Sequence, residues 1–460
     1  MMLRRRDVIR SLGLAAALPL LSFGGGSPAR AATRIQRLVT PGGIEAWFVQ
    51  DSTVPLVAME YAFAGGAAQD PADKPGLSNM VADLLDEGAG DLDANAFHGR
   101  LERRAIQMSF GTARDFFRGS LRLLKEDRDE AFDLLRLALT EPRFDSEAVE
   151  RIRSQIVSGL RRESTTPSAV VSRAFWQLAY PDHPYGRPAG GTLESVPTIT
   201  QADLHGYRRR TLSRDQLKIA VVGDIDADTL GRLIDRAFGA LPTKTDLVAV
   251  ADVAPTAPPR RLKVALDVPQ TVVMFGAPAP KRSDPDFMTA YVINHILGGG
   301  GLSSRLYREV REKRGLVYSI SESMIWMSHS SMLVGSTATR ADRAEQTIEA
   351  LSREIRRMGE AGPTQTELDE AKSYLKGSQM LALDSSAKIA AVLAQYQLDN
   401  LGIDYIERRN GLIDAVTLEG AQGVARRLWG QGLLTVEVGR TTEATAHSTA
   451  PVAPPAPVKN

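Results

Sequence analysis

The chain has 460 residues, of which 43% are hydrophobic and 24% are charged, so it can form two or more globular domains with sizeable cores. Its formal net charge of +1 argues against nucleic acid or an anionic membrane as the main partner. It contains no cysteine, which excludes disulfides, thiolate metal sites and cysteine nucleophiles.

Residues 1–31 predict a twin-arginine export signal. Arg5 and Arg6 precede an apolar stretch that begins at Leu12, and the sequence Ala-Arg-Ala ending at Ala31 offers a small-residue cleavage site. The apolar stretch is shorter than the roughly 20 residues of a membrane span, so an uncleaved anchor is the less favoured alternative. Export by this route predicts a periplasmic protein.

Residues 32–243 carry a series of strand and helix patterns that predict a first domain. Short β-branched and aromatic runs around a Gly-Gly turn predict strands at its start. In chain order we then expect a helix over residues 75–87, strands within 104–124, two helices separated by Glu141 and Pro142, and a buried strand, a turn and a helix over 217–241.

Residues 262–440 repeat that order of patterns and predict a second, homologous domain. A repeat of roughly 200 residues is too long for a solenoid, so it indicates a duplicated α+β domain with a mixed sheet packed with helices. The Pro- and Ala-rich residues 244–261 predict a linker, and the Pro-, Ala- and Thr-rich residues 441–460 predict a disordered tail. We expect the two α/β domains to form a clamshell.

Common catalytic motifs are missing from the sequence. There is no G-x-S-x-G motif, no P-loop and no G-x-G-x-x-G after a strand. Gly298 to Gly301 could form a phosphate nest, but no Lys-Ser/Thr pair follows them. No two of the six histidines lie four residues apart, and His183 falls in a Pro- and Gly-rich loop where it is predicted to be a polar turn residue.

Residues 297–320, "LGGGGLSSRLYREVREKRGLVYSI", predict a helix followed by a strand. Apolar side chains spaced four residues apart, at Leu302, Leu306 and Val310, should bury one helix face. Arginines should line another face, at Arg305, Arg308 and Arg311. Gly315 suits the C-terminal end of the helix, and residues 316–320 read as a strand. Spacing alone favours a surface ion pair for Arg311 and a packed position in the sheet for Tyr318.

The same segment resembles the C-terminal signature of the pitrilysin/insulinase family of metallopeptidases. In that family a Gly-rich helix start leads to L-R-E-K-x-G-L-x-Y, and this chain has "VREKRGLVYS" with Arg311 and Tyr318 seven residues apart. The resemblance extends over nearly the whole mature chain. The duplicated halves and the linker lie where the family has them, and so does the segment "HPYGRPAGGTLESVPTIT" followed by "VVGDID".

The resemblance implies a zinc motif, H-x-x-E-H, just after "PGL" in the first half, but this chain lacks it. The His, Glu and His positions hold Asn79, Ala82 and Asp83. The family's third ligand falls near residues 158–160, and Glu163 is slightly out of register. Asn with one carboxylate is a poor zinc pair, and Ala82 leaves no general base, so no metal is expected in this chain.

The resemblance also implies a role for the second half. In the family, the Arg and Tyr bind the substrate and polarise the scissile carbonyl, so Arg311 and Tyr318 are the expected assisting catalytic and substrate-binding residues. Gly299, Gly300 and Gly301 either contact substrate or form a tight helix start. Such a chain is expected to be the non-catalytic subunit of a heterodimer, whose homologous partner supplies H-x-x-E-H and zinc and whose substrate is an unfolded peptide.

Two other classes of function remain open. The chain could be a stand-alone peptide-binding or chaperone-like clamshell, or a structural assembly subunit similar to the core subunits of respiratory complexes. Retention of "REKRGLVY" argues mildly against a purely structural role, because a scaffold has no chemical need for it. An active peptidase with a displaced site would need a metal that these residues hardly offer.

Overall fold

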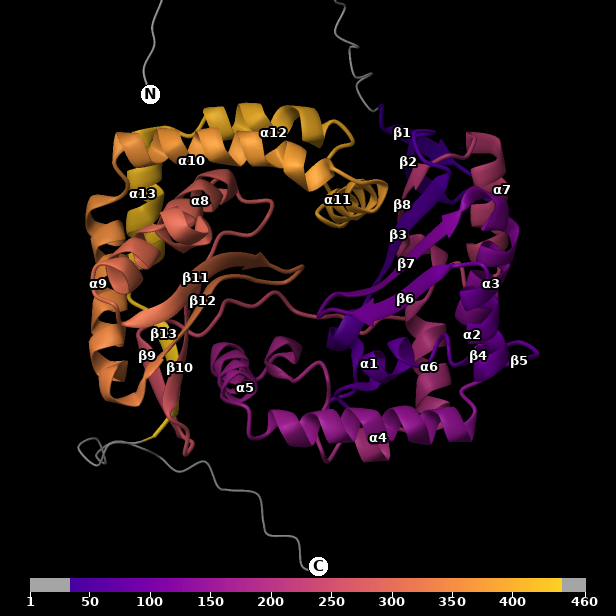
Figure 1. Cartoon of the computed structure of the whole chain (residues 1–460), viewed down its shortest axis with the longest axis horizontal. Helices are drawn as coiled ribbons and strands as arrows, with labels where there is room; N and C mark the ends of the chain where they lie inside the picture. Colours follow the sequence, from indigo (N-terminus) through magenta and orange to yellow (C-terminus); the bar gives the residue numbers. More distant parts are fainter. Residues whose placement is uncertain (1–33, 441–460) are drawn as a thin grey trace, which may run out of the picture. The chain divides into compact units, whose positions relative to one another are not determined.

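The computed structural model describes residues 34–440 and contains two mixed sheets packed with helices (Figure 1). The predicted export signal (residues 1–31) and the predicted tail (residues 441–460) lie outside the described residues. Within the described part of the chain, no helix is long and apolar enough to cross a membrane. The α+β class predicted from the sequence is confirmed, whereas the clamshell stays a prediction.

The first sheet has the strand order β1-β2-β8-β3-β7-β6. Only β2 and β8 pair in parallel; the other neighbours are antiparallel. Its strands are β1 (Gln36–Val39), β2 (Glu45–Gln50), β3 (Leu56–Ala64), β6 (Gln107–Thr112), β7 (Phe116–Leu124) and β8 (Lys218–Gly223). The helices of this half are α1 (Leu77–Ala82), α2 (Ala94–Arg103), α3 (Arg128–Thr140), α4 (Ser146–Glu163), α5 (Pro167–Ala179), α6 (Gln201–Thr211) and α7 (Ala227–Phe238), and β4 (Gly88–Ala89) pairs with β5 (Leu92–Asp93).

The second sheet has the strand order β11-β12-β10-β13-β9, which repeats the first sheet without a counterpart of β1. Here β13 and β9 form the parallel pair. Its strands are β9 (Arg260–Ala265), β10 (Gln270–Pro278), β11 (Val317–Trp326), β12 (Ser331–Arg340) and β13 (Leu434–Gly439). The helices are α8 (Phe287–Asn294), α9 (Ala344–Ala361), α10 (Gln365–Gly377), α11 (Ser386–Leu398), α12 (Tyr405–Asp414) and α13 (Leu418–Trp429).

A cross-strand contact confirms that the two sheets are built alike. In the first sheet Tyr61 on β3 lies opposite Gly119 on β7, and in the second Phe275 on β10 lies opposite Gly335 on β12. Each aromatic ring covers its glycine so closely that an added Cβ would lie 2.1 Å from the Tyr61 hydroxyl oxygen or 2.2 Å from the Phe275 Cζ atom. The glycine leaves room for a large core side chain on the neighbouring strand.

Each half contributes one helix to the other half's sheet. Side chains of α5, such as Phe175, pack with Met332, Val334 and Leu434 of the second sheet. Conversely, α11 lies against the first sheet (Figure 1). Its Leu393 packs with apolar residues of β2 and β8, namely Trp47, Val49, Ala220 and Val222. Both sheets are therefore covered on one face by their own helices and on the other by a helix from the opposite half.

A polar cluster also connects the two halves. The Tyr185 hydroxyl donates a 2.5 Å hydrogen bond to Asp115 and accepts one of 3.0 Å from the His329 amide. The other oxygen of Asp115 accepts the Ser328 amide at 2.9 Å. His183 is a turn residue, as predicted, because its Nδ1 accepts the Tyr185 amide at 3.2 Å. The bonds of Asp115 and Tyr185 to Ser328 and His329 connect the β6–β7 loop to the β11–β12 hairpin.

The segment predicted as a linker contains no helix or strand from residue 245 to residue 257. It is held by contacts with both halves: the Gln69 side chain bonds the Val248 backbone at 2.9 and 2.8 Å, and the Val253 amide donates to the His329 carbonyl at 2.9 Å. The predicted domain boundaries remain a prediction.

The helix predicted over residues 75–87 is shorter than expected. α1 begins at Leu77, because Gly76 has a left-handed φ of 95°, and it ends at Ala82. After that point the chain makes turns, in which the Leu84 amide bonds the Val81 carbonyl and the Glu87 amide bonds the Leu84 carbonyl. The helices predicted on either side of Glu141 and Pro142 are confirmed as α3 and α4.

Candidate functional site

Two polar side chains, one in α1 and one just after it, hydrogen-bond each other in the helix that would hold zinc. The Asn79 side-chain amide donates a 3.1 Å hydrogen bond to the Asp83 carboxylate, and Ala82 is buried in the core. Glu163 lies exposed at the last residue of α4. Within residues 34–440, no group of three or more His, Cys, Asp or Glu side chains is placed to hold a metal ion. These residues do not fit a zinc ion, which needs about four N, S or O ligands.

The segment after α8 is not a single helix. It contains a π-helical turn at His295–Gly299, a 3₁₀ turn at Gly301–Ser303 and a second π-helical turn at Tyr307–Glu312. The prediction that Leu302 shares a buried helix face is wrong: its side chain is 70% exposed, because it lies in the 3₁₀ turn before the helix. Leu306 and Val310 are buried as predicted.

The arginine row also differs from the prediction, because one of its members is buried. Arg305 is 5% exposed and donates to both carboxylate oxygens of Glu367, at 2.6 and 2.5 Å, and to the Gly362 carbonyl at 3.0 Å. Burial opposes ionisation of Glu367, but hydrogen bonds from Arg305 and from Thr364 outweigh it and lower the pKa to about 2. This ion pair fastens the start of the second π-helical turn to α10.

Arg311 and Tyr318 lie at the two ends of the segment that carries the family resemblance. The Arg311 guanidinium lies 5.0 Å from the ring centroid of Tyr307, at cation–π distance. Gly315, with φ 59°, ends the helix as predicted, and β11 begins at Val317. No hydrogen bond or ring contact within the described chain joins Arg311 to Tyr318.

A β-bulge keeps the Tyr318 ring out of the core. The pairing of β11 with β12 shifts register between Val317 and Ile320, and both of these residues are buried. Without the extra residue, Tyr318 would share the inward face with Ile320. Tyr318 is instead 87% exposed, so the alternative in which it packs within the sheet is wrong.

The glycines ahead of this helix have structural reasons of their own. An added Cβ would lie 2.8 Å from the Asn294 side-chain nitrogen at Gly299 and 2.7 Å from the His295 carbonyl oxygen at Gly300. Gly301 has a left-handed φ of 59°. A tight chain path therefore accounts for all three, and their expected contact with substrate stays a prediction.

A buried carboxyl group that the sequence reading missed lies under this glycine run. Glu322 is 2% exposed on β11, and its Cβ lies so close to Gly298 that an added Cβ there would come within 2.5 Å. Neither carboxylate oxygen has a hydrogen-bond partner in the described chain. Burial disfavours the charged carboxylate and raises the pKa of Glu322 to about 8. The Trp429 indole lowers this pKa, but by less than burial raises it. The inward place of Glu322 could have been read from alternation with Ile320 and Met324.

Two family models match the chain. One described as insulinase (peptidase family M16) matches residues 48–193, and one described as peptidase M16 inactive domain matches residues 198–375. A relative named "non-peptidase homolog YmxG", from Helicobacter pylori, is 27% identical over 336 residues, which cover 73% of this chain and 77% of the relative. An uncharacterized zinc protease from Mycobacterium leprae is 26% identical over 408 residues, covering 85% and 88%.

Solved structures share the fold. The crystal structure of a peptidase M16 inactive domain from Pseudomonas fluorescens has a TM-score of 0.83 and 28% identity, covering 89% of this chain and 98% of that chain. A chain of complex III2 from Candida albicans, with Inz-5 bound, has a TM-score of 0.71 and 14% identity over 88% and 96%, which shows the fold alone. With its two matching family models and this common fold, the chain belongs to the M16 peptidase (insulinase) family, and it lacks the family's H-x-x-E-H residues.

Proposed function

We propose that this chain is an exported, non-catalytic subunit of a heteromeric zinc metalloendopeptidase. In this proposal a homologous partner carries H-x-x-E-H, and Arg311 and Tyr318 act on the partner's peptide substrate. The observation that carries it is the contrast between α1, which offers no zinc-binding set, and Tyr318, which a bulge holds out of the core. The relative named a non-peptidase homolog supports the loss of activity in this chain alone.

Tyr318 and Arg311 have the chemistry that this role needs. A phenol hydroxyl and a guanidinium both donate hydrogen bonds, and the guanidinium stays charged at any working pH. Donors aimed at a carbonyl oxygen stabilise the negative charge that develops there during peptide hydrolysis. The ring of Tyr307 against Arg311 restricts the free rotation of a long side chain and so favours one direction of approach.

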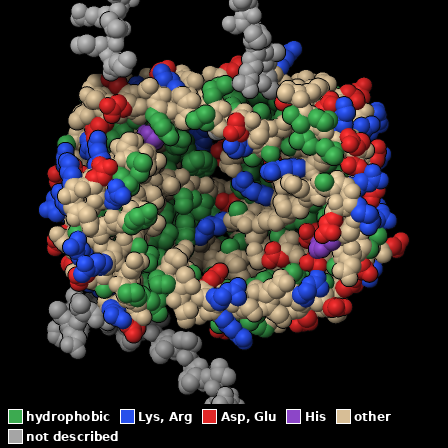
Figure 2. All heavy atoms as spheres, in the orientation of Figure 1, with side chains coloured by type: hydrophobic (Ala, Val, Ile, Leu, Met, Phe, Trp, Pro, Cys, Tyr) green, Lys and Arg blue, Asp and Glu red, His purple; other side chains and the backbone are tan. Residues whose placement is uncertain are grey.

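The edges of both sheets suit an extended peptide. In the described chain β6 and β11 are edge strands, which have unpaired backbone groups that can hydrogen-bond another strand. Figure 2 shows hydrophobic side chains gathered around a hollow on one face, with Lys and Arg side chains nearby. Such a mixed surface supports binding of unfolded peptides without a strict sequence motif. The presence of this fold within complex III2 supports assembly with other subunits.

Reconstitution with the zinc-bearing partner tests the role of the pair. Tyr318→Phe removes one exposed hydroxyl, and Arg311→Ala removes one guanidinium, so assembly should be unchanged. Loss of one such donor should lower kcat for peptide hydrolysis by about 10²-fold, as for an oxyanion donor. Peptide turnover and analytical ultracentrifugation on the same samples separate catalysis from assembly.

Matched controls are available on the same half of the chain. Tyr374→Phe changes another exposed tyrosine, and Arg353→Ala changes an exposed arginine of α9; both should leave turnover unchanged. Wild-type turnover in the Arg311 and Tyr318 variants would remove the pair from the mechanism. If no zinc-bearing chain co-purifies with the tagged protein, a stand-alone peptide-binding protein becomes the better account.

Export is part of the same proposal and rests on the sequence of residues 1–31. Arg5→Lys together with Arg6→Lys should leave the chain in the cytoplasm if the twin-arginine route carries it. Fractionation of cells with an antibody against the mature chain measures this directly. Normal periplasmic recovery of the double variant would exclude that route.

A further inference from the structure

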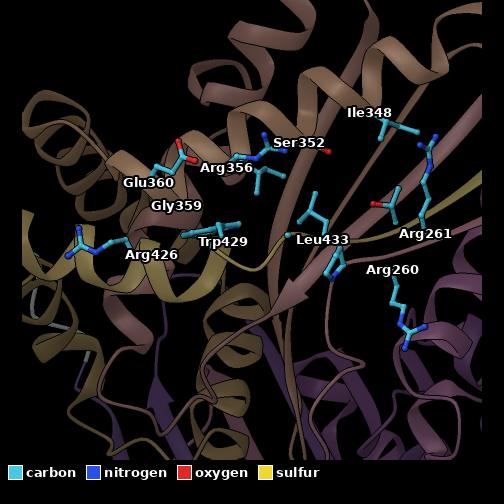
Figure 3. Close-up of a pocket in the computed structure, with 15 residues that line it drawn as sticks. Arg260, Arg261, Ile348, Ser352, Arg356, Gly359, Glu360, Arg426, Trp429 and Leu433 are labelled. Atoms are coloured by element: carbon cyan, nitrogen blue, oxygen red, sulfur yellow. The ribbon is translucent and has the colours of Figure 1, made fainter.

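A groove of about 710 Å³ lies beside strand β9, and it is not lined by Arg311 or Tyr318 (Figure 3). It is formed by the first residues of β9, by one side of α9 and by the last turn of α13 with the loop that follows it. Its floor is apolar and includes Ile355, Trp429 and Leu433. This volume is within the range of about 300 to 1,000 Å³ that is usual for binding pockets.

The rim of the groove carries more positive than negative charge. Arg260, Arg356 and Arg426 are exposed lining residues, and no salt bridge within residues 34–440 involves any of them. Figure 3 shows Arg356 near the middle of the groove, with Glu360 beside it, and Arg260 and Arg426 toward opposite ends. Exposed guanidinium groups therefore outnumber carboxylates among the lining residues, and Figure 3 shows the Arg260 side chain pointing away from Arg356 and Trp429.

A fourth arginine that lines the groove forms ion pairs within the chain. Arg261 donates to both carboxylate oxygens of Glu345, at 2.8 and 2.7 Å, and to Glu437 at 2.8 Å. Its charge is neutralised inside the chain. The other three arginines of the groove have no such internal counterpart in the described chain, so an incoming ligand with negative charge would complement them.

The backbone of β9 adds a second binding element. The strand of the first sheet that corresponds to β9 is β2. There β1 pairs with β2 along Gln36 to Val39, so the edge of β2 is covered. In the second sheet β9 pairs with β13 on one side, and no described strand pairs with its other side. An extended peptide can take the place next to β9 that β1 takes next to β2.

We propose that this groove binds an acidic, extended peptide segment, which pairs with the free side of β9, contacts Arg356 and Arg426 through carboxylates and places an apolar side chain on the Trp429 floor. The proposal does not depend on a zinc-bearing partner, because every group in it belongs to this chain. Both the backbone pairing and the apolar floor favour a peptide over an inorganic anion.

Fluorescence anisotropy with the full mature chain tests the proposal. The probe is a fluorescein-labelled peptide of glutamates around a central Leu-Phe pair, and its matched control has glutamine at every glutamate. We expect saturable binding of the acidic peptide and at least tenfold weaker binding of the control. Arg356→Gln and Arg426→Gln should each weaken binding by about fivefold, as expected for loss of one charge-assisted contact.

Arg353→Gln is the matched control variant, because Arg353 is exposed on α9 but does not line the groove. It should bind the acidic probe like the wild type. Equal binding of the acidic and glutamine peptides, or equal binding by all three variants and the wild type, would overturn the proposal. Binding of phosphatidylglycerol vesicles without binding of the peptide would also overturn it, in favour of a lipid surface.

The chain's own C-terminal segment is the remaining competitor for the groove. A variant that ends at Arg440 lacks residues 441–460 and keeps β13, which ends at Gly439. Under the proposal it binds the probe with unchanged affinity. A tenfold or greater gain in affinity would show that this segment occupies the groove, and the proposal of an external peptide would fail.

Discussion

The buried carboxyl of Glu322 should make the stability of this protein fall as the pH rises. Its pKa is about 8 in the folded chain, against an ordinary value of 4.5, because burial without a hydrogen-bond partner disfavours the charged form. Between these two values the folded state holds one more proton than the unfolded state. The contribution to stability is therefore full below about pH 4.5 and is lost as the pH rises through about 8.

The size of this effect follows from the two pKa values. One proton difference changes the free energy of unfolding by about 1.4 kcal/mol per pH unit, so it should decrease by roughly 4 kcal/mol from about pH 5 to about pH 8. Glu322→Gln has nearly the same shape and does not titrate. Urea unfolding at several pH values should show wild type and variant diverging by this slope, with the variant relatively more stable at high pH.

A control variant separates Glu322 from other titrating groups. Glu349→Gln changes an exposed carboxylate on α9 and should keep the wild-type pH dependence. All other groups contribute equally to wild type and Glu322→Gln, so only the difference between them is diagnostic. If the two unfolding curves run parallel from about pH 5 to about pH 8, the carboxyl is ionised in the folded state and the reasoning is refuted.

Two further predictions concern stability. Arg305→Met removes the main partner of Glu367, which keeps Arg308 and Thr364 as partners. It should cost about 1.5 to 3 kcal/mol in the free energy of unfolding, measured by urea titration, and no measurable loss would contradict a stabilising ion pair. Gly335→Ala forces the Phe275 ring to move and should lower the free energy of unfolding by about 1 to 3 kcal/mol. The control Gly377→Ala, whose added Cβ meets no atom within 4 Å, should not destabilise the protein. Equal melting temperatures for the two variants would disprove the close contact.

The duplicated α+β architecture could be predicted because each half repeats the same apolar periods. The helix exchange could not, since the pattern of α5 or α11 shows that an apolar face exists but not which sheet it covers. Phe175 and Leu393 each have a sheet of their own half nearby in sequence, yet they pack on the other one. The choice is made by chain path and shape, which involve contacts more than 100 residues apart.

The failures near the candidate site have a local cause. Leu302 fits the i+4 spacing of a helix, but the glycine run before it forms π-helical and 3₁₀ turns, which change the number of residues per turn. A bulge then moves Tyr318 to the exposed side of β11, and single-sequence alternation does not reveal an inserted residue. The groove beside β9 could not be predicted from the sequence, because its lining residues Arg260, Arg356 and Arg426 are distant from one another in the chain.

Tyr318 contributes little to the stability of the fold, so a change at this residue reports on function rather than on folding. Asn79 and Asp83 bond each other, and Arg305 is buried against Glu367, so these polar groups contribute to the chain's own structure. Tyr318 makes no such contact in the described chain and covers no core surface at 87% exposure. Removing its hydroxyl should change the free energy of unfolding by no more than about 0.5 kcal/mol. A large loss of turnover in Tyr318→Phe would then report a contact with the substrate, because loss of structure cannot explain it.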